Sequence, residues 1–114
     1  MTVLKGFSES IVTMKADSGV VAGSLVEISA NDTVAACTDG NRLCGVVLSV
    51  DNGYADVQIR GYVKVGYAGS VSLGYNELTV DDDNKLEPAA TAGTGSDILV
   101  VNLDSTASVI GIIL

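Results

Sequence analysis

The stretch LCGVVLSVDNGYADVQIRGYVKV, residues 43–65, decides the fold expected for this chain. Asn52-Gly53 separates two runs of alternating apolar residues, and this dipeptide favours a tight hairpin turn because both of its positions need a positive φ. Below the closing pair Asp51–Tyr54, the turn puts three apolar pairs on one face: Val50–Ala55, Leu48–Val57 and Val46–Ile59. The other face is mostly polar. Turn chemistry and side-chain pattern therefore predict the same register.

The second strand of this hairpin is expected to continue past Gly61. Beyond that glycine, Tyr62 and Lys64 fall on the outward face, and Val63 and Val65 on the inward face. The alternation predicts one long strand at the centre of a β-domain.

The rest of the chain extends the β pattern. Short strand-like runs alternate with turn signals, and no helical period persists. We therefore expect an all-β fold, a small single-domain β-barrel or sandwich of short antiparallel strands and hairpins over residues 11–114. Residues 1–10 lack periodicity and are expected to form an extended arm. Two acidic turns, near Gly40 and near Asp82, resemble each other only faintly, which does not establish an internal repeat.

Charge and composition disfavour several function classes. The net charge is −8 at pH 7, and an acidic surface repels the phosphate backbone of nucleic acids. The chain has no histidine, so it lacks the usual general base and the commonest metal ligand. No apolar run is long enough to span a membrane, and residues 1–15 do not have the pattern of a secretion signal.

The two cysteines, Cys37 and Cys44, have two interpretations. A turn at Gly40-Asn41 would place them opposite each other, where a disulfide is conceivable. Without a secretion signal, reduced thiols that act as small apolar residues are the favoured interpretation. Their spacing does not match a zinc site, and no second pair exists.

No constellation of residues predicts catalysis or a cofactor. Asp81-Asp82-Asp83-Asn84 invites a calcium interpretation, but it lacks the spacing, glycine and distal glutamate of a calcium loop. A solvated turn is favoured instead. The carboxylates Asp51, Asp56 and Glu77 fall in turns or on outward positions, and no tryptophan is present to bind a sugar. We therefore expect a protein that is not an enzyme and holds no metal.

Tyrosine and nearby basic residues are the best candidates for an interface, because both types are enriched where proteins meet. The alternative, held equally, is that the tyrosine rings cover the ends of a barrel. Phe7, the only phenylalanine, could help the arm to dock on a neighbour. The candidate interface residues are Phe7, Tyr54, Arg60, Tyr62, Lys64, Tyr67 and Tyr75.

The chain as a whole resembles the small phage capsid decoration, or cement, proteins. The similarity spans residues 11–114 and departs from the family pattern in the 89–96 loop and at the Asp104 turn. The residues that carry it are structural glycines and alternations at 21–26, 44–47, Gly53, 55–65, 71–74 and 78–81, followed by a hydrophobic last strand.

The resemblance implies a non-enzymatic protein of the virion. Such a protein binds the major capsid protein on the outside of an expanded shell and stabilises it, often as a homotrimer near three-fold positions. It would be assembled in the host cytoplasm, where thiols stay reduced, and would bind neither nucleic acid nor membrane. Its contacts with a partner would come from residues 1–10 or from the face that carries Tyr62.

Two other function classes remain open. One is a cellular module that binds a carbohydrate or another small ligand, which a deep pocket lined by tyrosines would favour. The other is a hydrolase with two catalytic carboxylates, which activity lost on changing one Asp or Glu would favour.

Overall fold

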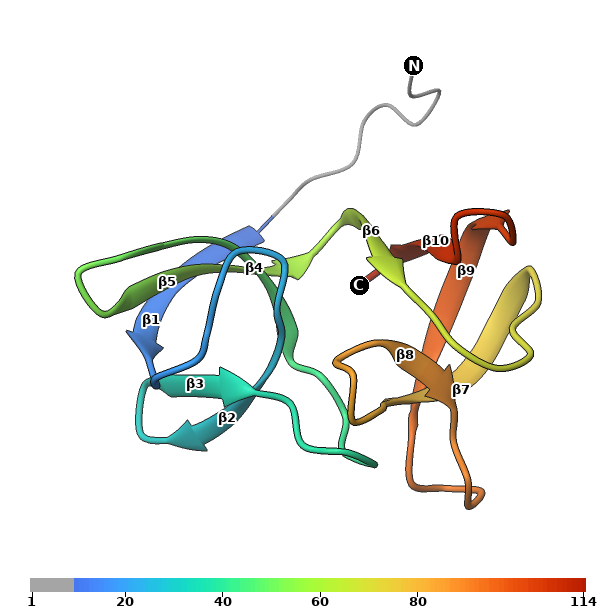
Figure 1. The fold of residues 1–114 in the computed structure, drawn as a ribbon, viewed down its shortest axis with the longest axis horizontal. Coiled ribbons are helices and arrows are strands. Elements are labelled where there is room, and N and C mark those ends of the chain that lie inside the picture. Colours follow the sequence, from blue (N-terminus) through green and yellow to red (C-terminus); the bar gives the residue numbers. More distant parts are fainter. Residues whose placement is uncertain (1–9) are drawn as a thin grey trace.

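The computed structural model describes residues 10–114, and its regular structure is entirely β (Figure 1). The expected all-β class is therefore confirmed, while the predicted arm lies outside the described residues except for Ser10. No helix in this range is long and apolar enough to cross a membrane. The strands are β1 (Ser10–Ala16), β2 (Leu25–Ala30), β3 (Thr33–Ala36), β4 (Gly45–Asp51), β5 (Tyr54–Arg60), β6 (Tyr62–Gly66), β7 (Gly74–Val80), β8 (Leu86–Pro88), β9 (Ser96–Asp104) and β10 (Val109–Ile113).

The strands form two units that lie side by side (Figure 1). The first is a closed barrel with the order β1-β3-β2-β4-β5, in which β1 also pairs with β5. The second is a five-stranded sheet with the order β6-β10-β9-β7-β8. Its two ends meet where Tyr67, just after β6, bridges Leu86 in β8. We call the units the first and second barrels; the sequence predicted one barrel domain for residues 11–114.

The two barrels are copies of one topology. In each, the first strand is antiparallel to the fifth and parallel to the third, and the second strand pairs with the third and the fourth. Single hydrogen bonds repeat as well: Ala16 N donates to Gly53 O at 2.9 Å, and Tyr67 N to Ser108 O at 3.1 Å. The chain therefore contains an internal structural repeat, in which the second barrel repeats the first.

Details of register show how closely the second barrel repeats the first. Ile28 pairs with Val34 in the first barrel, and Val80 pairs with Leu86 at the same place in the second. Both β4 and β9 carry a register shift at the corresponding position, beside Leu48 and beside Val101. The turn near Asp82 therefore corresponds to the Asn31-Asp32 turn, and not to the turn near Gly40.

The predicted central hairpin is confirmed at its turn and wrong further down. Asn52 and Gly53 have φ of 51° and 80°, and Val50 pairs with Ala55 as expected. The bulge at Leu48 then shifts the register, so that Val57 faces Val47 and Gln58 faces Val46. A bulge inserts one residue on one strand, and this one turns Val47 inward and leaves Leu48 exposed.

The expected continuation through Gly61 is also wrong. Gly61 has φ of 103°, a left-handed conformation that breaks the strand and directs the chain into the second barrel. Consequently β6 pairs with β10 rather than extending the first barrel. The stretch predicted to be one long strand is therefore two strands, β5 and β6, and the break between them connects the first barrel to the second.

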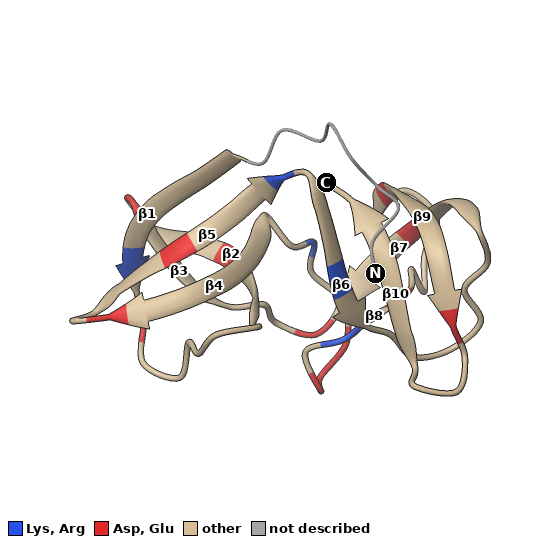
Figure 2. Ribbon diagram, turned by 90° about the horizontal axis from the view of Figure 1, so that it is seen from above, with Lys and Arg blue, Asp and Glu red and all other residues tan. Residues whose placement is uncertain are grey.

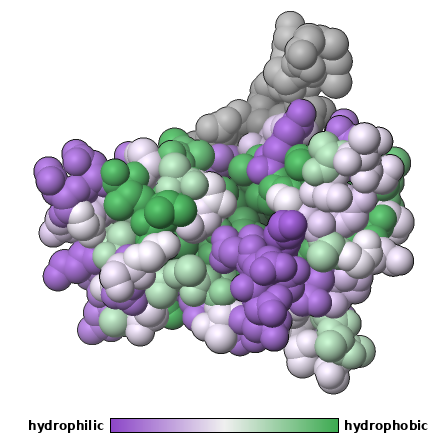
Figure 3. Space-filling view, in the orientation of Figure 1, coloured by the Kyte–Doolittle hydropathy of each residue, from purple (hydrophilic) through white to green (hydrophobic). Residues whose placement is uncertain are grey.

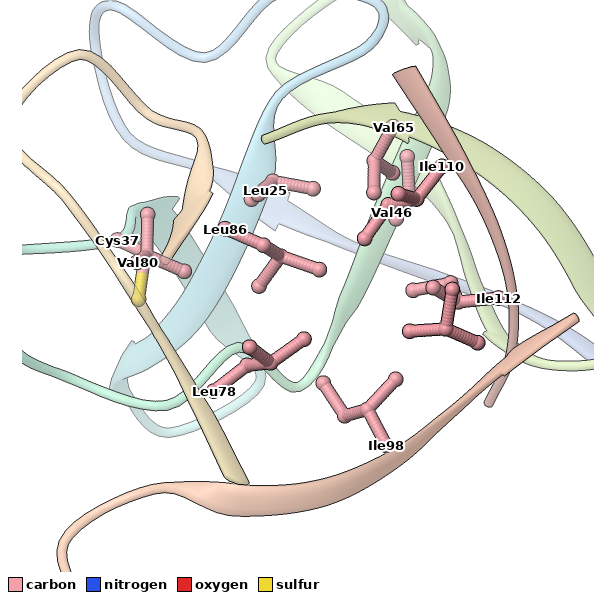
Figure 4. Packing of buried hydrophobic residues seen from close by; sticks show 11 residues of the cluster. Leu25, Cys37, Val46, Val65, Leu78, Val80, Leu86, Ile98, Ile110 and Ile112 are labelled. Atoms are coloured by element: carbon pink, nitrogen blue, oxygen red, sulfur yellow. The ribbon is translucent and has the colours of Figure 1, made fainter. Parts of the chain in front are cut away.

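One hydrophobic core joins the two barrels. Leu25, Cys37 and Val46 from the first barrel lie among side chains of the second, which include Leu78, Leu86, Ile110 and Ile112 (Figure 4). A smaller cluster fills the inside of the first barrel: Val20, Val26, Val34, Val47, Ala55 and Val57. Because the larger cluster uses residues from both units, neither barrel buries its apolar surface alone.

Candidate interaction surfaces

The acidic turn between β7 and β8 joins the two barrels. Asp81 Oδ1 accepts hydrogen bonds from the backbone N–H groups of Asp83 and Lys85, both at 2.9 Å, which closes the turn. Asn84 then takes a left-handed conformation with φ of 61°. Its side-chain Oδ1 accepts from Leu25 N at 2.8 Å, and its Nδ2 donates to Leu25 O at 2.9 Å. The amide group thus pairs with the start of β2 in the first barrel as a backbone would.

This geometry gives the aspartates of the turn a structural explanation. Within residues 10–114, the only group of three or more potential metal-ligating side chains is Asp81, Asp82 and Asp83, whose candidate atoms lie within 4.8 Å of one another. One carboxylate oxygen of Asp81 already accepts two backbone hydrogen bonds, and Asp82 and Asp83 are exposed turn residues. The proximity of these three carboxylates is explained by the turn, and it does not by itself support a metal site.

A second contact between the barrels comes from residues 38–41, which we call the docking turn. Gly40 N donates to Val80 O at 2.8 Å, and Val80 N donates to Asn41 O at 2.9 Å. The docking turn therefore pairs with the edge of β7 like a short added strand. Figure 3 shows a hydrophilic patch on the surface where the barrels meet.

Glu27 holds the docking turn in shape. Its carboxylate accepts hydrogen bonds from Asn41 Nδ2 at 2.7 Å and from Thr38 Oγ1 at 2.9 Å. Burial alone would raise the pKa of Glu27, but these hydrogen bonds, with one from the Cys37 thiol, hold the pKa below its ordinary value. The ionised form of Glu27 is therefore the form that stabilises the turn.

The cysteines do not face each other as the sequence suggested. Cys37 N donates to Leu25 O and Cys44 N donates to Val26 O, so the two residues lie on opposite flanks of β2. The turn responsible is centred on Asp39-Gly40, one residue earlier than predicted, since Asn41 N donates to Thr38 O. Both thiols are free, and burial together with the Glu27 carboxylate raises the pKa of Cys37 to about 12. Such a thiol is a poor nucleophile at neutral pH.

The four tyrosines do not form one surface. Tyr54, at the tip of the β4–β5 hairpin, is 49% exposed, and Tyr75 on β7 is 75% exposed. Tyr67 packs against the shared core. Tyr62 covers Gly111, where an added Cβ would lie 2.8 Å from two of its ring carbons. Two of the four predicted interface tyrosines therefore have structural roles.

The remaining predicted interface residues are Arg60, Lys64 and Phe7. Arg60 at the end of β5 and Lys64 in β6 are exposed on either side of the Gly61 break (Figure 2). Phe7 lies outside the described residues. The structure thus brings Arg60 and Lys64 near the connection between the barrels, and leaves Tyr54 and Tyr75 on different barrels.

The sequence prediction missed an open groove of mixed polar and apolar lining on the first barrel. Its volume is about 810 Å³, and it is lined by Val12, Thr13, Met14 and residues 28–32. Ile28 is 57% exposed and Val12 is 39% exposed, although both lie on the inward faces of their strands. Figure 3 shows hydrophobic side chains at the surface of this barrel. No pattern in the sequence predicts this groove. Ile28 alternates with the core residue Val26, and this alternation predicts that the Ile28 side chain is buried.

Comparisons of the sequence found no matching protein-family model and no matching curated protein. Function must therefore be argued from the surfaces. Among described residues, these comprise the groove, the exposed aromatic residues Tyr54 and Tyr75, and an acidic exterior.

Proposed function

We propose that this chain is a non-enzymatic structural protein that binds the outer surface of a phage capsid through its major capsid protein, and stabilises the shell as a homotrimer. The observation that supports a binding role most strongly is the exposure of large apolar side chains on a well-packed small protein. Tyr75 is 75% exposed, Leu73 is 64% exposed and Ile28 is 57% exposed. Leu73 and Tyr75 lie two residues apart on the second barrel and Ile28 lies in the groove of the first, so each barrel offers an apolar area for contact with another molecule.

Two further features support a structural role in a virion. The barrels are joined by a shared core and by backbone-type contacts at Leu25 and Val80, so the chain presents its surfaces on a rigid frame. The net charge of −8 suits the outside of a capsid better than contact with packaged DNA. The identification of the shell as a phage capsid rests on the resemblance to decoration proteins.

The second candidate is a module that binds a small ligand or carbohydrate, and the groove favours it. Its volume of about 810 Å³ is within the range of small-molecule sites, and its rim includes the carboxylate of Asp32. The groove is open, however, and no tyrosine lines it. A deep pocket lined by tyrosines was the feature expected to favour this function from the sequence.

Co-sedimentation with expanded, emptied phage heads tests the proposal. We expect the purified chain to pellet with expanded heads at saturating stoichiometry, and to raise the temperature at which the heads break. Unexpanded heads are the control, and Tyr75→Ala and Tyr54→Ala identify the contacting face. Failure to bind expanded heads at any concentration, together with saturable binding of a small glycan, would replace this proposal with the ligand-binding module.

A further inference from the structure

Within the chain, a turn of the first barrel contacts a strand edge of the second barrel. The equivalent turn of the second barrel and the equivalent edge of the first barrel make no such contact within residues 10–114. Within the chain, the docking turn of the first barrel pairs with the backbone of Val80, at the edge of β7 in the second barrel. If the two barrels are equivalent, the second barrel should also carry a docking turn, and the first should also carry a receiving edge.

The second docking turn exists and is exposed. Thr94 N donates to Thr91 O at 3.2 Å, as Asn41 N donates to Thr38 O at 2.9 Å. Gly93 has φ of 87°, and its counterpart Gly40 has φ of 86°. Residues 91–94 are all exposed, and no described backbone group outside this loop bonds to them as Val80 bonds to the first docking turn.

The second receiving edge exists as well. Ile28 occupies in β2 the place that Val80 occupies in β7, opposite Val34 and Leu86 respectively. Val80 is fully buried beneath the docking turn, whereas Ile28 is 57% exposed. Since β2 pairs with β4 only at Leu25 and Val26, the edge of β2 at Ile28 has no strand beside it within residues 10–114.

The groove beside this edge is the unfilled form of a site that is filled in the second barrel. Val12, Met14 and Ile28 correspond by strand pairing to Val63, Val65 and Val80. Those three valines belong to or pack against the shared core, into which the first barrel inserts Leu25 and Cys37. In the first barrel the same place is the open groove of about 810 Å³.

We propose that copies of this chain associate head to tail, with the 91–94 turn of one copy paired to the Ile28 edge of the next. The face that enters the groove is the one that carries Tyr75 and Glu77 on β7, since Glu77 occupies the position of Leu25. Ala89 N donates to Glu77 O at 3.0 Å, as Cys37 N donates to Leu25 O at 2.9 Å. The association repeats between chains the contact that joins the barrels within one chain.

Two substitutions in the repeat make this contact weaker than the internal one. Asp32 stands where Asn84 stands in the second barrel, and a carboxylate cannot donate to a carbonyl as the amide does. Glu77 replaces Leu25 on the entering face, which brings a second carboxylate toward a groove already lined by Asp32. The exposed ring of Tyr75 supplies apolar area on the same face. We therefore expect a reversible association that depends on concentration. Because the contact is heterologous and not self-complementary, it joins copies into a ring where the rotation between them closes, and into an open chain where it does not.

Sedimentation of the purified full chain without capsids tests this inference separately from the capsid proposal. We expect the mass to rise with concentration. Ile28→Asp blocks the receiving edge, and Gly93→Pro removes the donor N–H and forbids the positive φ of the turn. Each variant should weaken association by roughly 30-fold or more. Val21→Asp is the matched control, since Val21 is 61% exposed and lies outside the groove.

Mixing the two variants gives the sharpest result. Ile28→Asp retains an intact turn and Gly93→Pro retains an intact edge, so the mixture should form a 1:1 complex that grows no further. A self-complementary interface gives no such complementation, and that outcome would overturn the inference. A wild-type chain that stays monomeric up to ~1 mM would overturn it without any variant.

Discussion

At the residue scale, Asn84 has the most specific task at the junction. Its amide both accepts from Leu25 N and donates to Leu25 O, and its backbone is left-handed. Asn84→Asp keeps a residue that tolerates this conformation but removes the donor. We expect a loss of roughly 1–3 kcal/mol in unfolding free energy, because a part-buried carbonyl loses its partner beside a new charge. Chemical denaturation measures it.

Asp83→Asn is the matched control for that change, because it alters a charge one position away on an exposed side chain. It should leave the stability nearly unchanged. Equal midpoints for Asn84→Asp and the wild type would show that the side-chain pairing contributes nothing to the junction.

Gly53 is the second residue with a position-specific requirement. Its φ is 80°, and nothing lies within 4 Å of where a Cβ would be, so the constraint is conformational and not steric crowding by neighbours. Gly53→Val should cost roughly 1–3 kcal/mol, since a β-branched residue resists positive φ. Gly53→Asn should cost clearly less, because asparagine tolerates this region. Thermal unfolding that ranks the two variants equally would count against the turn assignment.

At the element scale, the docking turn depends on the ionisation of Glu27. The folded-state pKa of Glu27 lies below its ordinary value of 4.5, so its contribution to stability is present above that pH. The contribution is lost as the pH falls through the folded-state pKa. Glu27→Gln should therefore be less stable than the wild type at neutral pH, and the gap should narrow on acidification below about 4.5. Melting temperatures of both proteins across this range measure the gap, and a constant gap would contradict the role given to the carboxylate.

The strands themselves show what local sequence can and cannot predict. The Asn52-Gly53 turn was predictable because positive φ restricts the residue type. The bulge at Leu48 was not, since Val47 and Leu48 are both apolar and either can face the core. Gly61 was mistaken for a strand residue because the apolar alternation continues on both sides of it. Its conformation is set by the second barrel, which local pattern does not describe.

The candidate surfaces were predictable only where a residue type signals exposure. Tyr54 and Tyr75 are exposed, whereas the Tyr62 ring lies over Gly111 and Tyr67 packs against the core. Neither of these last two placements follows from the residue type. The groove was missed because Ile28 has the pattern of a core residue. It is exposed because no strand in the described part of the chain lies beside its edge, which is a property of the strand pairing and not of the residue.

At the scale of the whole molecule, the chain is a pair of equivalent barrels whose sequences have diverged. The turn Asn52-Gly53 corresponds to the longer turn at residues 105–108, and Leu25 corresponds to Glu77, so few identities remain to reveal the repeat. The backbone hydrogen bonds and the strand register still show the repeat, although the side chains at equivalent positions differ. Because the contact between the barrels is head to tail, it leaves one docking turn and one receiving edge exposed, and the divergence at these positions makes their pairing between chains weaker.

Hydrogen exchange at the Val80 and Ile28 amides tests this equivalence most directly. Val80 N bonds to Asn41 O, so its amide should exchange slowly at every protein concentration. The Ile28 amide should exchange rapidly in dilute solution and become protected as the concentration rises and a second copy pairs with the edge. An Ile28 amide that exchanges rapidly at all concentrations, or that is protected in the dilute monomer, would contradict the account.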